Sequence, residues 1–381
     1  MHFYNYCNSK ILNITGILIL LFMILMFASV QVSAQDEIAG DVNGDGILDV
    51  RDTVIIMQYV LGLKSLNEAE ITAADVNADG SVDVRDVTML MRFILGLDDG
   101  FENQFLLGSE VLLSEKRYLV EGKNVGLVTN QSGVNSSGES TMELLFKDED
   151  INLVALYTPE HGLDGTAKAG EYVKSYTHEE YNIPVYSLYG ETRMPTIDML
   201  EDIDVLIYDI QDIGARSYTY ISTLNYCMQA AQNYGVAVIV LDRPNPLSGL
   251  IVDGPMMEER FKSFVGVDIL PKAHGMTVGE LARYFNRNIE VQLTVVPMQG
   301  YSRDMIYQDT GLPWVKTSPN IPDLEAVFGY MATGLGEGTG VFQADQFRWI
   351  GGRGLDADQY AARLNDAGLE GVEFVAEARN D

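Results

Sequence analysis

Cysteine is scarce in this chain of 381 residues, which contains only Cys7 and Cys227. Cys7 lies before a long apolar run near the N-terminus, and we expect it to be removed with that segment. A single remaining cysteine cannot form an internal disulfide, so the fold must be held by packing and by bound metal. Cys227 falls within a helical pattern, which favours a buried thiol over a nucleophile.

Basic residues are also few, with 25 lysines and arginines against 55 aspartates and glutamates and a formal net charge of −30. This balance argues against nucleic acid or an anionic membrane surface as a partner. The patterns H-E-x-x-H, C-x-x-C, G-x-S-x-G and the Walker loop are absent from the sequence. A zinc enzyme, a serine esterase and a P-loop nucleotide site therefore have no support.

One long apolar run does occur, from Ile11 to Val30, and Lys10 precedes it. Val32-Ser33-Ala34 follows as a small-residue cleavage site, so residues 1–34 are predicted to be a signal peptide. The alternative is a retained membrane anchor, because the run is long enough to span a bilayer. We expect a secreted, extracellular protein without a membrane segment after cleavage.

A repeat follows this segment, with residues 41–63 and 75–97 as its two copies. Each copy opens with D-x-N-x-D-G, a loop whose alternate positions supply the oxygen ligands that Ca²⁺ requires. Matching ligand positions in both copies predict two calcium ions. The predicted ligands are Asp41, Asn43, Asp45, Ile47 (backbone carbonyl), Asp49, Asp52, Asp75, Asn77, Asp79, Ser81 (backbone carbonyl), Asp83 and Asp86.

Two features separate these loops from EF-hands. The twelfth position is Asp where EF-hands have Glu, and no helix-length segment precedes the first loop. A single amphipathic helix is predicted after each loop, over 53–61 and 87–95. Residues 41–98 thus resemble a type I dockerin, and we assign 35–100 to this module. The resemblance implies two bound calcium ions and a cohesin module of a scaffolding protein as partner.

From residue 106 onward, short apolar strands alternate with helices. This alternation predicts an α/β domain with a parallel sheet covered on both faces. The predicted strands are 125–129, 153–157, 185–188, 205–208, 236–241 and 291–296, and the predicted helices include 141–147, 219–234 and 278–285.

Polar, turn-forming clusters follow four of these strands. They are the stretches 130–133, 158–162, 209–216 and 242–246, and three of them contain carboxylates. Ligands of open parallel sheets bind beyond the carboxyl ends of the strands. The clusters therefore predict an active cleft at that edge of the sheet.

The same clusters belong to a set of ordered blocks that resembles the NamZ family of exo-β-N-acetylmuramidases. The matching stretches are 125–131, 157–162, 186–192, 209–216, 241–246, 274–277 and 318–322. The resemblance implies a Rossmann-like catalytic domain, here 101–290, and a smaller C-terminal subdomain, here 291–381, that closes the cleft. It implies release of N-acetylmuramic acid from non-reducing ends of peptidoglycan fragments, with no cofactor expected in the catalytic domain. Residues 338–354 depart from the family pattern, so we expect a shortened C-terminal subdomain.

Cleavage of a glycosidic bond requires an acid at the leaving oxygen and a group that opposes the developing positive charge. We predict Glu160 as the acid, with His161 either orienting it or hydrogen-bonding the sugar. The structural alternatives are a carboxylate that caps a turn and a histidine that is satisfied within the fold. Asp209 or Asp212 is the predicted second carboxylate, Asp242 is a further candidate, and the acetamido group of the substrate is an alternative to all three. The predicted substrate-binding residues are Asn130, Arg216, Asp242, Arg243, Asn245 and His274.

The lactyl group of muramic acid carries a carboxylate, which suits the planar fork of arginine. Arg216 and Arg243 are the first candidates for this contact, followed by Arg193. Each of these assignments has a structural alternative, because an aspartate at a strand end also caps helices and pairs with arginine. Two other functions stay open: a non-catalytic peptidoglycan-binding module carried on a dockerin, and a glycosidase for another amino sugar.

Overall fold

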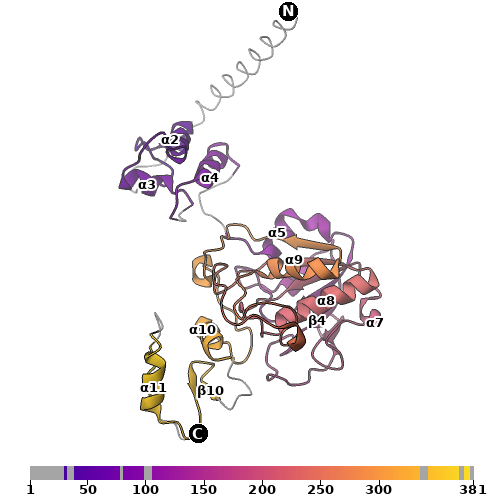
Figure 1. Cartoon of the computed structure of the whole chain (residues 1–381). Coiled ribbons are helices and arrows are strands. Elements are labelled where there is room, and N and C mark those ends of the chain that lie inside the picture. The colour runs from indigo at the N-terminus through magenta and orange to yellow at the C-terminus, as the bar shows by residue number, and fades with distance from the viewer. Residues whose placement is uncertain are drawn as a thin grey trace, which may run out of the picture. The chain divides into compact units, whose positions relative to one another are not determined.

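The structure is a computed structural model, and it describes residues 30–31, 38–77, 80–97, 105–334, 342–368 and 373–377. The chain divides into two compact units, Met1–Gln104 and Phe105–Asp381, which are described separately (Figure 1). Most of the predicted signal peptide lies outside the described residues. Within the described part, no helix is long and apolar enough to cross a membrane.

In its described residues, the first unit contains the helices α2 (Val50–Val60), α3 (Glu68–Ala74) and α4 (Val84–Ile94), and a short pairing of β1 (Val30–Gln31) with β2 (Ile47–Leu48). α2 begins three residues before the predicted start, because Asp49 caps it and Asp52 completes the capping box. Ile56 of α2 and Leu90 of α4 are fully buried in the small core between the repeats. α3 was not predicted.

The second unit is built on a seven-stranded sheet in the order β5-β6-β4-β3-β7-β8-β9. All neighbouring strands are parallel except β5, which is antiparallel to β6. The strands are β3 (Asn124–Thr129), β4 (Asn152–Thr158), β5 (Tyr176–Thr177), β6 (Pro184–Ser187), β7 (Val205–Asp209), β8 (Ala237–Leu241) and β9 (Leu293–Val296). The predicted α/β class with a mainly parallel sheet is confirmed.

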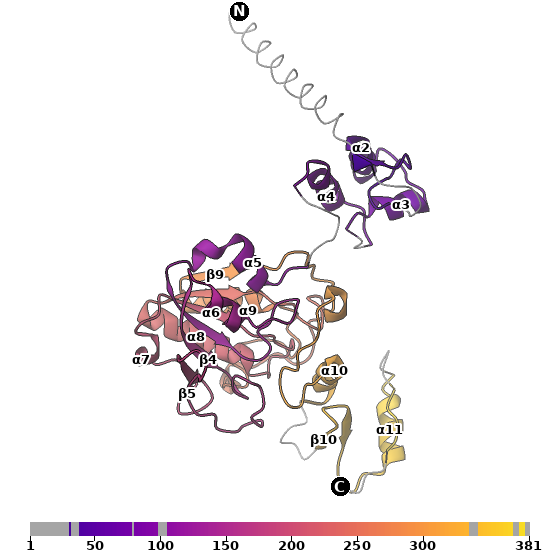
Figure 2. The ribbon, with the colours of Figure 1, turned by 180° about the vertical axis from the view of Figure 1, so that it is seen from behind.

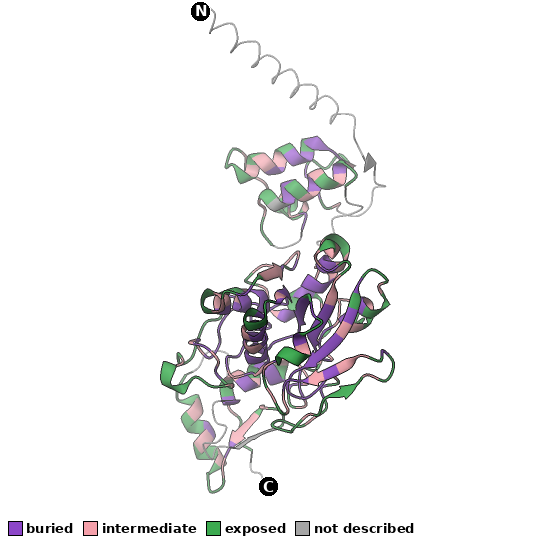
Figure 3. Ribbon diagram, turned by 90° about the vertical axis from the view of Figure 1, so that its right-hand side faces the viewer, coloured by how far each residue is buried: buried purple, intermediate pink, exposed green. Residues whose placement is uncertain are grey.

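Helices cover both faces of this sheet (Figure 2). α8 (Tyr220–Tyr234) and α9 (Val278–Ile289) contribute to the core on one face, and α5 (Gly108–Glu115) and α6 (Thr141–Lys147) to the core on the other. The first four residues of β7 alternate between the two cores, and all five residues of the strand are buried. Figure 3 shows that buried residues are gathered in the interior of this unit, with exposed ones mainly on its outer loops and helices. This double burial explains why the strands are continuous apolar runs in the sequence.

The remaining elements are mostly short. They are α7 (Ile197–Leu200), α10 (Leu324–Thr333), α11 (Ala357–Asn365), the antiparallel pair β10 (Phe342–Ala344) and β11 (Trp349–Gly351), and the 3-10 turns η1 (Arg117–Leu119), η2 (Glu259–Phe261) and η3 (Tyr307–Thr310). β9 pairs with β8, so the large sheet continues past residue 290, where we had placed the end of the catalytic domain. Cys227 is buried on α8, where its surroundings raise the pKa of the thiol.

Candidate functional site

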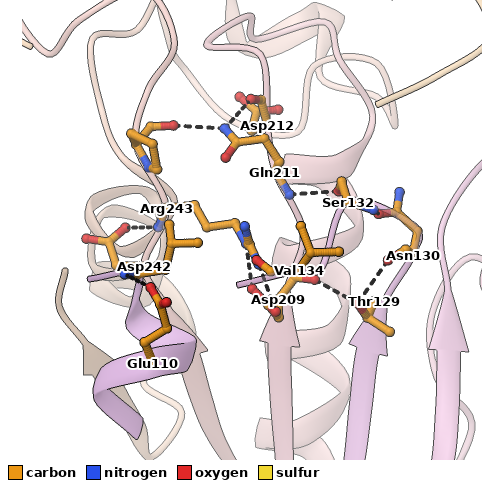
Figure 4. A network of polar contacts seen from close by, with 12 residues as sticks. Glu110, Thr129, Asn130, Ser132, Val134, Asp209, Gln211, Asp212, Asp242 and Arg243 are labelled. Carbon is orange, nitrogen blue, oxygen red and sulfur yellow. Dashed lines mark hydrogen bonds and ion pairs between the residues drawn. The ribbon is translucent and has the colours of Figure 1, made fainter. Parts of the chain in front are cut away.

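The strand order reverses between β3 and β7, which start the two halves of the sheet. Loops from the carboxyl ends of these two strands diverge at such a point and leave room for a ligand. Thr129 and Asp209 lie opposite each other at the ends of β3 and β7, and the Thr129 hydroxyl donates to the Asp209 carbonyl at 2.9 Å (Figure 4). The carboxyl edge of the sheet, where we predicted the active cleft, therefore includes the topological switch point between β3 and β7.

Hydrogen bonds join the loops that follow β3, β7 and β8 at this edge (Figure 4). Ser132 Oγ donates to Asn130 Oδ1 at 2.6 Å and accepts from the Gln211 backbone N–H at 3.1 Å. The Gln211 side chain donates to the carbonyls of Asp212 and Pro244 at 2.8 and 2.9 Å. Neither Ser132 nor Gln211 is among the predicted site residues, although both lie in the predicted clusters.

Asp209 and Arg243 form a buried bidentate ion pair. Arg243 Nε lies 2.6 Å from Asp209 Oδ1, and Nη2 lies 3.0 Å from Oδ2. Arg243 also donates to the Val134 carbonyl at 2.7 Å, and the Asp209 side chain is fully buried. The pairing favours a structural role for both residues over the catalytic and lactyl-binding roles that we predicted.

Asp242 is directed to the N-terminus of α9. It accepts hydrogen bonds from the Gly279 backbone N–H at 2.7 Å, the Thr277 hydroxyl at 3.0 Å and the Arg243 backbone N–H at 3.0 Å. A Cβ atom at residue 279 would lie 2.7 Å from Asp242 Cγ, so glycine is required for this approach. Burial raises the pKa of Asp242 to about 6. Its contacts are those of a helix cap, the structural alternative that we had left open.

Glu160 follows β4 and is 8% exposed. Its Oε2 accepts from the Thr219 hydroxyl at 2.6 Å, and its Oε1 accepts from the Gly170 backbone N–H at 2.8 Å. Neither partner was predicted, because Thr219 lies just before α8 and Gly170 lies in the long loop after β4. The carboxyl group is thus fixed from two sides and shielded from bulk solvent.

The turn after Glu160 is conformationally unusual. His161 has a φ of 75°, a left-handed value that few non-glycine residues adopt. Its Nδ1 lies 2.7 Å from the Ala167 carbonyl and therefore carries the proton of that hydrogen bond. Its Nε2 then has a lone pair in the neutral ring. His161 anchors the loop that holds Glu160, which agrees with a positioning role.

Asp212 and His274 meet in a second buried cluster. Asp212 Oδ2 accepts from the Gly214 backbone N–H at 2.7 Å and lies 3.5 Å from His274 Nε2. The Met276 backbone N–H donates to His274 Nδ1 at 3.2 Å, so the neutral ring has its proton on Nε2, facing Asp212.

Several buried polar atoms around this cluster have no hydrogen-bond partner among the described residues. They are Asp212 Oδ1, His274 Nε2, Asn130 Nδ2, Gln211 Oε1 and Arg216 Nε. Buried polar groups are almost always paired in folded proteins. Three of these residues, Asn130, Gln211 and Asp212, directly follow β3 or β7 at the switch point, where their unpaired atoms could bind a polar ligand.

Two tyrosines connect the clusters of Glu160 and Asp212. The rings of Tyr218 and Tyr220 meet edge to face with centroids 4.8 Å apart. Burial raises the pKa of both, with a further contribution from the charge of Asp212 at Tyr218 and of Glu160 at Tyr220. Both hydroxyls donate to Thr317, and the Tyr218 bond to Thr317 Oγ1 is 3.0 Å long. The loop at residue 317 therefore packs against the same site.

Arg216 and Asn245 differ in how many of their side-chain polar atoms have hydrogen-bond partners. Arg216 Nη1 donates to the carbonyls of Pro255 and Leu270, both at 2.6 Å, and the guanidinium forms no ion pair in the described part of the chain. Desolvation lowers the pKa of Arg216. The Asn245 side chain accepts from the Leu247 N–H and donates to the Met276 carbonyl, which makes it a support for the loop.

In the first unit, the two repeat loops have matching geometry. Asp52 and Asp86 are fully buried, and each accepts from the backbone N–H groups of two loop residues. Gly46 and Gly80 each donate 2.8 Å bonds to the first aspartate of their loop. Asp79 lies outside the described residues.

The donor set of these loops fits Ca²⁺ in chemistry, because it consists of carboxylate, amide and carbonyl oxygens. Burial raises the pKa of Asp52, which a bound cation would offset. In the first loop, the Arg51 guanidinium forms ion pairs with two of the predicted ligands, at 2.8 Å to Asp45 and 2.7 Å to Asp49. No three acidic or histidine side chains in the described ranges are gathered into a metal-binding cluster.

Comparison with known proteins gives the same division of the chain. Residues 125–325 match the family model of the N-terminal part of the exo-β-N-acetylmuramidase NamZ, and residues 39–95 match the dockerin type I domain. The peptidoglycan β-N-acetylmuramidase NamZ of Bacillus subtilis (strain 168) is 46% identical over 275 residues. That match covers 71% of this chain and 66% of the relative, so the chain spans just under two thirds of its length.

Two solved structures of DUF1343 family proteins from Bacteroides fragilis NCTC 9343 are also similar. One is 42% identical with a TM-score of 0.66 and covers 71% of each chain. The other is 31% identical with a TM-score of 0.53 and covers 62% of this chain and 63% of the solved one. The family match includes every cluster at the carboxyl edge of the sheet. The chain belongs to the NamZ exo-β-N-acetylmuramidase family and carries a type I dockerin domain ahead of its family region.

Proposed function

We propose that this protein is a secreted glycoside hydrolase that releases N-acetylmuramic acid from non-reducing ends of peptidoglycan fragments. The observation that carries the proposal is the buried position of Glu160 at the carboxyl edge, fixed by Thr219 and Gly170. A second buried carboxylate, Asp212, keeps one oxygen without a partner among the described residues. Family membership supplies the substrate class.

In this proposal Glu160 donates a proton to the glycosidic oxygen as the bond to the sugar breaks. The Thr219 hydroxyl suits this role, because it can donate to the ionised carboxylate and accept from the protonated acid. His161 fixes the loop around Glu160 through its bond to the Ala167 carbonyl.

Asp212 is the preferred second carboxylate. Asp209 is occupied by Arg243 and Asp242 by the N-terminus of α9, whereas Oδ1 of Asp212 is free to face a ligand. Asp212 would oppose the positive charge on the sugar, activate water, or orient the substrate's acetamido group if that group attacks the anomeric carbon. His274 Nε2 lies 3.5 Å from the other oxygen of Asp212, and Asn130 Nδ2 is a further unpaired donor among the described residues.

A chromogenic β-N-acetylmuramide tests the proposal, with the full chain and calcium in the assay. Wild type should release the chromophore, and Glu160→Gln should lose at least about 10²-fold of the rate, as expected for a general acid. Unchanged thermal unfolding of Glu160→Gln would separate a chemical defect from a folding defect. A wild-type protein without turnover would reject the hydrolase.

The second candidate function is a peptidoglycan-binding module without catalysis. It is favoured by one observation, that two of the predicted carboxylates, Asp209 and Asp242, are engaged by Arg243 and by the N-terminus of α9. Calorimetry on peptidoglycan fragments would select it if binding occurs without product release.

For the first unit we propose calcium-dependent docking to a cohesin module of a scaffolding protein. The ligands would be the predicted oxygens of the two loops, and two ions would order them. The strand order of the second unit, with its switch point between β3 and β7, supports the proposed Rossmann-like classification of the catalytic domain. Pull-down by a cohesin in calcium, lost after chelation, tests the docking role.

A further inference from the structure

Arg193 lies against two aromatic rings at the edge of the site. Its guanidinium carbon is 4.2 Å from the centroid of the Tyr189 ring and 4.3 Å from that of Phe264. Tyr189 and Arg193 belong to the loop after β6, whereas Phe264 comes from the long segment between β8 and α9. Two loops far apart in the sequence thus hold one cationic group in the angle between their rings, which are tilted by 52°.

These contacts restrain Arg193 without neutralising it. Stacking on aromatic faces stabilises a guanidinium and limits its rotamers, but leaves the N–H groups on its edge able to donate. Arg193 is exposed and forms no ion pair with a carboxylate in the described ranges. By contrast, Arg243 is engaged by Asp209, and Arg216 is buried with Nη1 bonded to two carbonyls.

Tyr189 places Arg193 beside the proposed acid. Burial raises the pKa of Tyr189, the Glu160 carboxylate raises it further, and hydrogen bonding to Arg193 lowers it. Both Glu160 and Arg193 therefore interact with the same tyrosine side chain. The backbone joins the two groups as well, because the Gly170 N–H donates to Glu160 Oε1 at 2.8 Å and, three residues on, the Val173 N–H donates to the Tyr189 carbonyl at 3.1 Å.

We propose that Arg193, held by Tyr189 and Phe264, binds the lactyl carboxylate of the N-acetylmuramic acid residue that is cleaved at Glu160. The proposal rests on the proposed function and adds the residue that determines its sugar specificity. A chain with a net charge of −30 needs a local cation to accept an anionic sugar. The planar guanidinium matches a carboxylate with two parallel hydrogen bonds. N-acetylglucosamine lacks the lactyl group and would gain nothing from Arg193.

The test is calorimetric binding of three ligands to the full chain: N-acetylmuramic acid, its lactyl methyl ester and N-acetylglucosamine. The ester keeps the shape of the lactyl group but removes its charge. Wild type should prefer the free acid, and Arg193→Gln should weaken its binding about 10- to 100-fold, the loss of a charge-assisted contact. Binding of the ester and of N-acetylglucosamine should not change.

Two further variants make the result specific. Arg193→Lys keeps the charge but loses the fork, so it should recover only part of the affinity for the acid. Arg283→Gln removes an exposed arginine of α9 and should bind all three ligands as wild type does. Thermal unfolding of each variant checks that the stack at Tyr189 and Phe264 has not collapsed the fold.

Failure of this inference differs from failure of the proposed function. Equal binding of the three ligands by wild type, or an unchanged preference in Arg193→Gln, would overturn the role of Arg193 whether or not the muramide is hydrolysed. An Arg193-dependent preference in a wild type without turnover would keep the subsite and reject the hydrolase.

Discussion

Nε2 of His274 lies 3.5 Å from Oδ2 of Asp212, and both side chains are buried at the switch point of the sheet. The Met276 N–H donates a hydrogen bond to Nδ1 of His274. In the neutral ring the proton is therefore on Nε2, on the side of the Asp212 carboxylate. The Gly214 N–H binds the same oxygen. The Gly214 N–H thus holds Oδ2 with the His274 ring beside it, and Oδ1 has no hydrogen-bond partner among the described residues.

Removing the Asp212 carboxylate should therefore slow hydrolysis more than removing its support. We expect Asp212→Asn to lower kcat by about 10²- to 10⁴-fold, the range for a group that acts in the transition state. His274→Gln should lower kcat by roughly 10-fold with little change in KM, because it acts through Asp212. Steady-state kinetics on a chromogenic muramide gives both values.

Asp198→Asn provides the matched control for that pair, because Asp198 is an exposed aspartate on α7. Its kinetics should equal those of wild type. If Asp212→Asn kept wild-type kcat, Asp212 would have no part in the chemistry, and the substrate's acetamido group would have to act without it.

We expect the Asp209–Arg243 ion pair to contribute to the stability of the second unit and not directly to catalysis. Asp209→Asn leaves a buried guanidinium without its counter-charge, and breaking a buried pair in this way typically costs about 3–5 kcal/mol. We expect a large drop in the unfolding midpoint of the second unit. Replacing the exposed Asp198 in the same way should leave the midpoint unchanged. A variant Asp209→Asn that is as stable as wild type but inactive would instead return Asp209 to the catalytic candidates.

Much of the second unit could be predicted because its central strands are buried on both faces. β3, β4, β7 and β8 fall within a residue or two of the predicted strands, since double burial makes each a continuous apolar run. β5 was missed, because Tyr176 and Thr177 are exposed at the sheet edge and carry no such signal. The location of the polar clusters was also predictable, as parallel strands bring their carboxyl ends to one edge.

Which polar residue pairs with which was not predictable. Thr219 and Glu160 are 59 residues apart, and their contact depends on how α8 packs against the sheet. The stack of Arg193 on Phe264 likewise depends on the path of a long loop. The sequence placed Asp209, Asp212 and Asp242 at the same edge of the sheet. Only the packing shows that Asp209 forms an ion pair, that Asp242 caps a helix, and that one oxygen of Asp212 has no partner among the described residues.

Calcium removal should affect the two units differently. The aspartates of each repeat loop repel one another when no cation is present, and metal binding of this kind is coupled to folding. We expect a chelator to lower the helicity contributed by α2 and α4 and to abolish cohesin binding, while hydrolysis of a chromogenic muramide continues. Circular dichroism of the full chain with and without chelator, alongside the activity assay, measures both. Unchanged helicity would contradict calcium-dependent folding of the repeat.

Asp242 should give the second unit a characteristic pH dependence. Its pKa is about 6 in the folded protein against a reference value of 3.8, so the folded state binds the proton more tightly than the unfolded chain does. The stability of wild type should therefore fall as pH rises from about 4 to about 6, by roughly 3 kcal/mol from this group. Asp242→Asn cannot ionise, and it should lack this part of the fall.

The measurement is the free energy of unfolding of the second unit at several pH values in saturating calcium, for wild type and Asp242→Asn. Subtraction of the two curves removes the groups that they share. The difference should favour wild type most at the acid end and decrease through the window between the two pKa values. Asp198→Asn should give a curve parallel to wild type there. If Asp242→Asn also ran parallel to wild type, ionisation of the carboxyl at the α9 N-terminus would not be linked to folding, and the three donors at Thr277, Gly279 and Arg243 would fully offset its burial.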